Sequence, residues 1–168
     1  MKRTSQISMG TKRRVYQASW ATLTARELEF FQKGAKEISE MHEMKIPWQN
    51  FPLQQYMEQA RIMVYEQNGE LKGFMLSRLT SSIFNSNVIL LVQDLLYTRP
   101  GTRASYYLMQ DFIDFGKANA DHLISMVGKK TNIKGKNLER LGFSELEVIY
   151  RMETNRWVEV ETPKDFKT

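Results

Sequence analysis

The segment from Asn87 to Ala118 constrains the fold of this chain more than any other. Val88–Tyr97 is almost unbroken in apolar and β-branched residues, a pattern typical of a central strand that is covered on both faces. Arg99–Thr102 ends this run with a Pro-Gly turn. Beyond the turn, apolar residues recur at helical spacing, at Leu108, Met109, Phe112, Ile113 and Phe115. The segment therefore predicts a buried strand, a tight turn and an amphipathic helix.

The turn between this strand and this helix is a predicted anion-binding site. A strand that runs through a tight turn into a helix points several unpaired backbone N–H groups, and the positive end of the helix dipole, at one spot. Phosphate groups are the anions that such a geometry commonly binds. If the protein is catalytic, we expect its chemistry at the end of this strand.

Composition and length favour an ordinary soluble protein. The 168 residues, 42% hydrophobic and 26% charged, are typical of one domain with its own core, and the absence of cysteine excludes disulfides and thiolate chemistry. No apolar run approaches the roughly 20 residues of a membrane span, and the basic start lacks the apolar core of a signal peptide. We therefore expect a cytoplasmic protein without a membrane partner, made of a basic, loosely ordered arm (1–14) and a single domain (15–168).

Elsewhere the pattern predicts further strands and helices on either side of this segment. Thr24 and Glu27 have the spacing of a capping box at a helix start, and Gly73 indicates a close backbone approach or a bulge within a strand. The expected helices are Thr24–His42, Leu53–Ala60 and Asn137–Leu141, and the expected strands are Val15–Trp20, Ile62–Glu66, Leu71–Leu79, His122–Val127, Glu147–Met152 and Arg156–Val160. The sequence thus predicts an α+β fold, with a mostly antiparallel central sheet of about six to seven strands and helices on both faces.

Three stretches in this order resemble motifs of the GNAT superfamily of N-acetyltransferases. Asn68–Phe74 (NGELKGF) is similar to the hairpin pattern that precedes the cofactor strand of that family. Pro100–Ser105 (PGTRAS) stands where the family has its cofactor motif Q/R-x-x-G-x-G/A, and Asn137–Phe143 (NLERLGF) resembles the late "fYek-GF" segment. The resemblance covers most of Arg61–Met152 and looks closest to the GNAT-like proteins of tailed phages.

The resemblance implies acetyl-CoA as the cofactor and an amine, of a small molecule or a protein, as the acceptor of a directly transferred acetyl group. The pyrophosphate of the cofactor is expected on the backbone amides of the turn, at Gly101, Thr102, Arg103, Ala104, Ser105 and Tyr106. The family also pairs the backbone of its splayed central strand with the pantetheine arm, which by position implies Leu95, Leu96 and Tyr97.

The cofactor loop departs from the family's pattern at three positions. Pro100 stands at the Q/R position, Arg103 replaces the first glycine, and Ser105 replaces the small last residue. Glycine matters in such a loop because a phosphate must approach the backbone closely. Arg103 offsets the loss if its guanidinium contacts the phosphates directly.

Acetyl transfer to an amine also needs a base, a donor for the oxyanion and often an acid for the leaving thiolate. Asp94 is the candidate base, because an acid in an apolar strand has a raised pKa when it is buried and unpaired; pairing with an arginine is the structural alternative. The backbone N–H near Leu96 is the candidate oxyanion donor. Leu138 stands where the family has its acidic tyrosine, so Tyr150 and Tyr97 are the candidate acids.

Two other classes of function stay open. The first is a GNAT fold that has lost turnover and acts as an interaction or structural protein, for example a phage component in the host cytoplasm or the virion. The second is a protein that binds nucleic acid through its basic arm and through Lys129–Lys136; the net charge of +5 is compatible with either a polyanion or a phosphate-rich cofactor. The two histidines, His42 and His122, are too few and too isolated to predict a metal site.

Overall fold

The computed structural model describes residues 11–41, 53–125 and 135–144. The chain divides into two compact units, Met1–Lys134 and Gly135–Thr168. The first unit contains the sheet and three of the α-helices, and the second contains helix α4 (Gly135–Arg140), close to the predicted helix at Asn137–Leu141. None of the helices in the described part of the chain is long and apolar enough to cross a membrane.

The sheet of the first unit has five strands in the order β1-β2-β3-β4-β5. These are β1 (Arg13–Ala18), β2 (Arg61–Gln67), β3 (Glu70–Ser81), β4 (Ile89–Thr98) and β5 (His122–Ile124). The first three pairs of neighbours are antiparallel, and β4 and β5 are parallel. The described residues therefore form a mixed sheet of five strands, which corrects the prediction of six to seven mostly antiparallel ones.

The parallel pair has a simple cause. A helix lies between β4 and β5 in the chain, and a crossover through a helix brings the second strand back in the direction of the first. The predicted strands Glu147–Met152 and Arg156–Val160 lie outside the described residues. At the other edge, β1 begins at Arg13, so the last two residues of the predicted basic arm belong to a strand.

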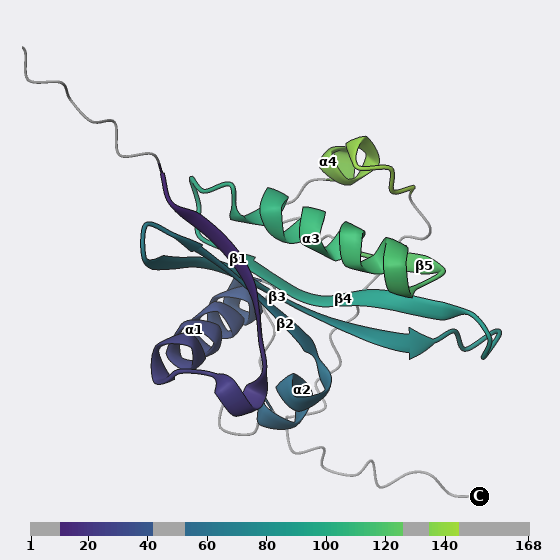
Figure 1. Cartoon of the computed structure of the whole chain (residues 1–168), viewed down its shortest axis with the longest axis horizontal. Helices are drawn as coiled ribbons and strands as arrows, with labels where there is room; N and C mark the ends of the chain where they lie inside the picture. The colour runs from purple at the N-terminus through teal and green to yellow at the C-terminus, as the bar shows by residue number, and fades with distance from the viewer. Residues whose placement is uncertain (1–10, 42–52, 126–134, 145–168) are drawn as a thin grey trace, which may run out of the picture. The chain divides into compact units, whose positions relative to one another are not determined.

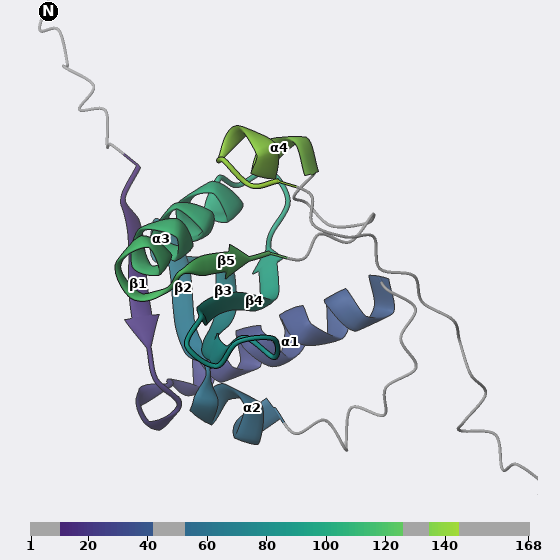
Figure 2. The same ribbon diagram turned by 90° about the vertical axis from the view of Figure 1, so that its right-hand side faces the viewer.

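Helix α1 (Ala25–Met41) and the short helix α2 (Leu53–Gln59) cover one face of the sheet, and α3 (Ala104–Asn119) covers the other (Figures 1 and 2). A 3₁₀ turn, η1 (Trp20–Thr22), leads from β1 toward α1. The predicted capping box at the start of α1 is confirmed. The Thr24 N–H donates to Glu27 Oε2 at 2.8 Å, and the Glu27 N–H donates to Thr24 Oγ1 at 3.2 Å.

The core on the α1 face is aromatic. Phe31 and Phe74 lie 4.6 Å apart between ring centroids, and Tyr97 packs against Phe74 at 5.6 Å. A Cβ added to Gly34 would lie 2.6 Å from the Phe74 ring and 2.7 Å from the Tyr97 ring, so glycine lets α1 approach the sheet closely at the end of β4.

On the other face, α3 buries most of the stripe that its sequence predicts: Leu108, Met109, Phe112 and Ile113 are buried, and Phe115 is half-buried. Arg61 of β2 fixes the middle of this helix, because its Nη1 donates to Asp111 Oδ2 at 2.7 Å. Its guanidinium also lies 4.2 Å from the centroid of the Phe115 ring. The strand and the helix of the opening segment are thus held on the two faces of the sheet, by α1 at the end of β4 and by Arg61 in the middle of α3.

Candidate functional site

Strand β4 is irregular at its centre. Ser77 of β3 pairs with Gln93, but the next residue toward the start of β3, Leu76, pairs with Leu95. Asp94 is therefore an extra residue, the sign of a β-bulge. A bulge bends its strand and redirects a side chain, and bulges are over-represented next to active sites.

The other side of β4 is paired with β5 only from Leu90 to Val92, and β5 ends at Ile124 (Figure 2). Within the described residues, the edge of β4 from Gln93 to Tyr97 has no neighbouring strand on this side. Leu95, Leu96 and Tyr97 lie on this stretch. Because alternate residues of a strand point their N–H and C=O groups to the same side, the edge offers donors and acceptors to an extended ligand.

The turn that follows β4 has a fixed shape. Gly101 has a φ of +74°, a left-handed conformation that favours glycine. The Thr102 hydroxyl donates to the Arg99 carbonyl at 2.8 Å, and the Arg99 N–H donates to the Lys72 carbonyl of β3, also at 2.8 Å. A Cβ added to Gly101 would have no atom within 4 Å, so the turn borders open space.

The start of α3 is held against β3. A Cβ added to Gly73 would lie 3.0 Å from the Ala104 Cβ and 3.0 Å from the Tyr97 carbonyl oxygen, so the close approach predicted at Gly73 is confirmed. Arg103 is the N-cap residue of α3 and makes no side-chain hydrogen bond to the first turn. The N–H groups of a first turn have no partner inside their own helix, so a ligand can use them.

Two tyrosines, Tyr106 and Tyr107, lie at the start of α3, and Tyr107 packs against β2. The Tyr107 ring stacks on Tyr65 with centroids 5.5 Å apart and an interplanar angle of 7°, and its hydroxyl accepts a 2.9 Å hydrogen bond from Arg13. Tyr106 packs edge-on against Tyr107 at 5.4 Å and is 54% exposed.

Asp94 is buried, as its apolar strand predicts, and it is paired. The side chain is 6% exposed, and Arg78 of β3 grips it with two hydrogen bonds, from Nε to Oδ2 at 2.6 Å and from Nη2 to Oδ1 at 2.9 Å. Pairing with an arginine is the alternative that the sequence left open. The carboxylate in turn raises the pKa of Arg78, mainly through these hydrogen bonds.

Tyr56 of α2 completes the cluster around Asp94. Burial raises the pKa of the Tyr56 hydroxyl to about 12, and the charge of Asp94 and a hydrogen bond to it add to this effect. The Arg78 guanidinium lies 5.6 Å from the centroid of the Tyr56 ring. Asp94 thereby ties together two strands and a helix that are far apart in the sequence.

Tyr97 points toward α1. Its hydroxyl donates to Glu37 Oε2 at 2.5 Å, and burial, with this hydrogen bond, raises its pKa to about 12. The hydroxyl proton is therefore already engaged on the α1 face. Tyr150, the other candidate acid, lies outside the described residues, and Leu138 lies in α4 of the second unit.

Sequence reasoning missed Arg78 and Tyr56. The signal for Arg78 was present, because it follows Phe74 and Leu76 at strand spacing and therefore shares their buried face. A cation on the buried face of one strand and an anion inside the next are natural partners. Tyr56 gave no such signal. Among the described residues, no group of three or more histidine or acidic side chains could hold a metal ion.

Comparison with known proteins gives a likeness in structure only. No model of a protein family matches the sequence, and no curated protein matches it. A possible acetyltransferase from Clostridium difficile 630 superposes with a TM-score of 0.62 at 13% identity, over 84% of this chain and 97% of that one. An aminoglycoside acetyltransferase from a soil metagenomic sample gives 0.60 at 11%, over 85% and 99%.

A third structure, the ribosomal-protein-alanine N-acetyltransferase of Brucella melitensis biovar Abortus 2308, gives a TM-score of 0.61 at 13% identity, over 85% of this chain and 99% of that one. The likeness therefore extends over nearly the whole of each of these proteins. At such low identity it establishes the fold alone, and the chain has the α+β fold of GNAT-type acetyltransferases.

Proposed function

We propose that this chain is an N-acetyltransferase that transfers an acetyl group directly from acetyl-CoA to an amine. The observation that carries the proposal is the meeting of three features at the end of β4. These are the bulge at Asp94, the edge from Gln93 to Tyr97, which has no neighbouring strand on the β5 side among the described residues, and the start of α3 without a side-chain cap. The fold, shared with known acetyltransferases, supports it.

The residues at the turn fit a phosphate-bearing cofactor. Gly101 borders open space, which lets a phosphate approach the backbone, and the exposed Arg103 adds a positive charge beside it. In the proposal, the N–H groups of the segment Gly101–Tyr106, which also contains Thr102, Ala104 and Ser105, hold the pyrophosphate. The backbone groups of Leu95, Leu96 and Tyr97 hold the pantetheine arm.

Acetyl-CoA, when bound, supplies an activated thioester. The amine nitrogen would take the acetyl group, and free CoA thiol would be the other product. The N–H of Leu96 is the proposed donor to the oxyanion, and Asp94 the proposed acceptor of the ammonium proton. Arg78 already holds this carboxylate with two hydrogen bonds, so in the proposal much of the acceleration comes from holding the reactants together. Tyr150 is the proposed proton donor to the thiolate.

The test is release of free CoA thiol from acetyl-CoA in the presence of a panel of amines. The panel includes an aminoglycoside and a peptide with an N-terminal alanine, because the structural neighbours include an aminoglycoside acetyltransferase and a ribosomal-protein-alanine N-acetyltransferase. We expect Asp94→Asn to keep the affinity for CoA and to lower turnover by about tenfold or more. Unchanged turnover would remove Asp94 from the mechanism.

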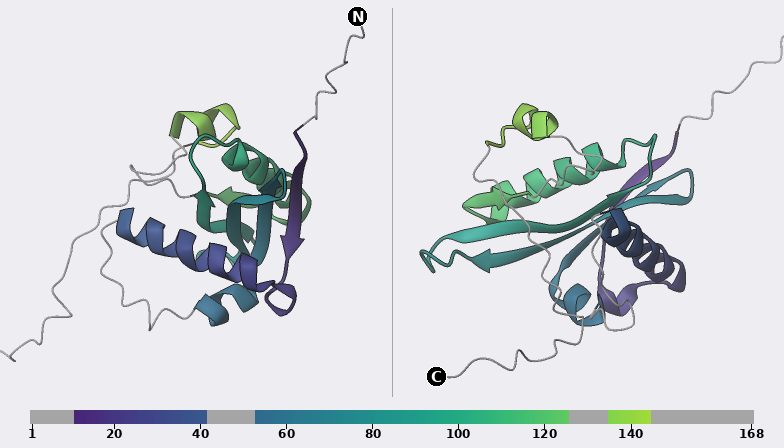
Figure 3. Two further views of the ribbon diagram at one scale, coloured as in Figure 1. Left: turned by 90° about the vertical axis from the view of Figure 1, so that its left-hand side faces the viewer. Right: turned by 180° about the vertical axis from the view of Figure 1, so that it is seen from behind.

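A second candidate function has an observation of its own. Ile83 and Phe84, at the tip where β3 and β4 project beyond the rest of the sheet, are 91% and 92% exposed (Figure 3). We propose as the alternative an interaction or structural protein, such as a phage component, that uses this apolar tip. It predicts no acetyl-CoA binding, and a partner whose binding is lost in Phe84→Ser but kept in Tyr106→Ser, which removes another exposed aromatic ring.

A further inference from the structure

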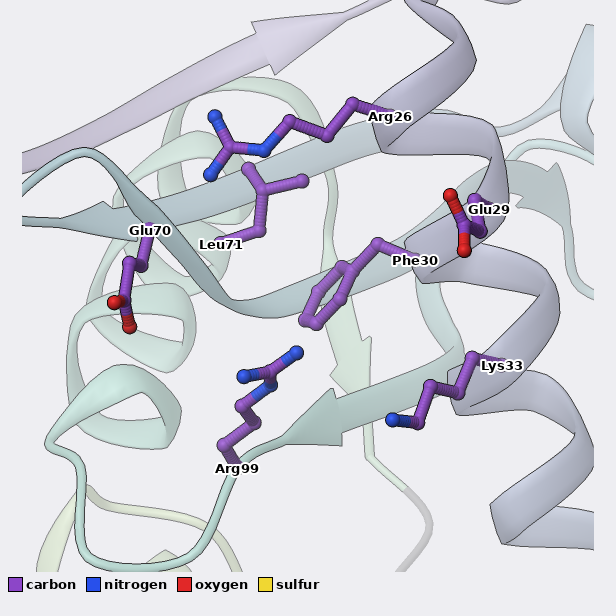
Figure 4. Close-up of a pocket in the computed structure, with 7 residues that line it drawn as sticks. All are labelled: Arg26, Glu29, Phe30, Lys33, Glu70, Leu71 and Arg99. Atoms are coloured by element: carbon purple, nitrogen blue, oxygen red, sulfur yellow. The ribbon is translucent and has the colours of Figure 1, made fainter.

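A hollow separate from the candidate cofactor turn lies on the α1 face of the sheet. Its volume is about 310 Å³, near the lower end of the range for small-molecule sites. The side chains that line it come from α1, from the start of β3 and from the residue after β4: Arg26, Glu29, Phe30, Lys33, Glu70, Leu71 and Arg99 (Figure 4). None of the residues from Gly101 to Tyr106 is among them.

Positive charge gathers in this hollow. Figure 4 shows Arg26, Lys33 and Arg99 around the ring of Phe30. Of the two lining carboxylates, Glu70 is already neutralised by an ion pair with Lys72. Three cations therefore face one remaining carboxylate, Glu29.

The lowered pKa of Glu70 reflects the positive charge around this hollow. It is lowered first by the hydrogen bond and charge of Lys72, and further by Arg99 and Arg26. A carboxylate at this position is therefore fully ionised at neutral pH, and it feels cations from three separate parts of the chain. Positive charges brought together without equal negative charge repel one another, an arrangement that a bound anion relieves.

Two of the three lining cations are oriented without being neutralised. Arg26 Nη2 donates to the Gly69 carbonyl at 2.6 Å, and the Arg99 guanidinium lies 5.4 Å from the centroid of the Phe30 ring. A carbonyl and an aromatic ring hold a guanidinium in place but leave its full charge. Lys33 forms no ion pair within the described part of the chain.

We propose that this hollow binds a small ligand that carries a phosphate group. A phosphate dianion offers several acceptor oxygens to two guanidinium forks and an ammonium group, the donor set that phosphate recognition favours. The volume leaves room for a small organic part beside the apolar surface of Phe30 and Leu71. The site does not depend on the proposed acetyltransferase activity: Arg99, the first residue of the turn, lines it, but none of the residues from Gly101 to Tyr106 that would hold the cofactor does.

The test is titration calorimetry with inorganic pyrophosphate at low ionic strength. Because the Gly101 turn is itself an anion site in our proposal, the titrations use the Gly101→Val variant as background. We expect binding in this background, weakened by about tenfold by Lys33→Gln and by Arg99→Gln. Lys36→Gln is the matched control, since it removes the same charge from an exposed position of α1 that does not line the hollow.

Pyrophosphate affinity that is equal in all of these variants, or no binding in the Gly101→Val background, would overturn the proposal. Circular dichroism verifies that each variant is folded; Lys33 and Arg99 are exposed, so we expect no change. A wild-type protein that binds pyrophosphate but not acetyl-CoA would contradict the proposed function and leave this inference standing.

Discussion

The two helices that start beside the sheet begin in opposite ways. The first turn of α1 is closed by its own side chains, because Thr24 and Glu27 cap each other and Tyr16 donates to Glu27 Oε1 at 2.5 Å. In the first turn of α3, the Ala104 N–H donates to the Thr102 hydroxyl at 3.4 Å, and the N-cap residue, Arg103, contributes no side-chain cap hydrogen bond.

In our proposal, this difference separates a structural helix end, that of α1, from one that binds a ligand, that of α3. A capping box satisfies N–H donors of the first turn and thereby stabilises the helix. A helix start without a side-chain cap, with a cationic N-cap residue, leaves its N–H donors available to an anion. The start of α3 also follows the bulged strand, so the proposed anion site and the bulge of β4 lie in one continuous stretch of chain.

The largest predicted effect comes from closing the approach to the start of α3. Gly101→Val should weaken acetyl-CoA binding by about a hundredfold or more, because a β-branched residue resists a φ of +74° and fills the space that the phosphate needs. Gly69→Val is the matched control, with a φ of +79° and no atom within 4 Å of the added Cβ. Calorimetry that finds equal losses in both variants would place the cofactor elsewhere.

A second variant makes α3 resemble α1. Arg103→Asp supplies a side-chain cap, which should stabilise the protein by about 1 kcal/mol. The same carboxylate repels phosphate, so acetyl-CoA should bind about tenfold more weakly. Thermal unfolding and calorimetry on one sample measure both changes. An unchanged affinity would mean that the start of α3 does not face the cofactor.

The converse variant removes a side-chain cap from the start of α1. Thr24→Ala removes the hydroxyl that accepts from the Glu27 N–H and should cost about 1 kcal/mol in the free energy of unfolding, measured in urea. Affinity for acetyl-CoA should not change, because this cap belongs to the structural end. A variant of unchanged stability that loses cofactor binding would show that the start of α1 also contributes to the cofactor site, which would contradict the distinction between the two helices.

The smallest effect is a pH dependence. Burial of Glu27 acts to raise its pKa, but hydrogen bonds from Tyr16 and Thr24 outweigh it and lower the pKa below the ordinary value of 4.5. The folded state therefore gains stability from the ionised carboxylate above pH 4.5 and loses it as the pH falls through the lower folded-state pKa. Glu27→Gln should flatten the dependence of the free energy of unfolding on pH in this range. If the variant loses as much stability on acidification as the wild type, other groups cause the effect.

Local pattern was enough to predict much of the architecture. The strand, turn and helix from Val88 onward, the hairpin around Asn68–Gly69 and the capping box at Thr24 all depend on neighbours in sequence, where periodicity and turn chemistry apply. The fold class followed from their order. The number of strands did not follow in the same way: the described residues form five, and the two further strands expected at Glu147–Met152 and Arg156–Val160 lie outside them.

The partner of Asp94 could not be predicted in the same way. Whether this carboxylate meets Arg78 depends on the register of β4 against β3, and that register shifts at the bulge that Asp94 itself creates. Tyr56 reaches the same carboxylate from a separate helix. Contacts of this kind are set by tertiary packing, so the sequence indicated which residue was unusual but not what it bonds to.

The most direct test of the central claim is a calorimetric titration of the wild-type protein with acetyl-CoA. The start of α3 without a side-chain cap, and the edge of β4 that no strand of the described residues pairs beyond Val92, predict binding at micromolar ligand, lost in Gly101→Val and kept in Gly69→Val. No detectable binding at millimolar ligand would contradict the claim: the uncapped helix start would then hold no cofactor, and the exposed tip at Ile83 and Phe84 would become the site to pursue.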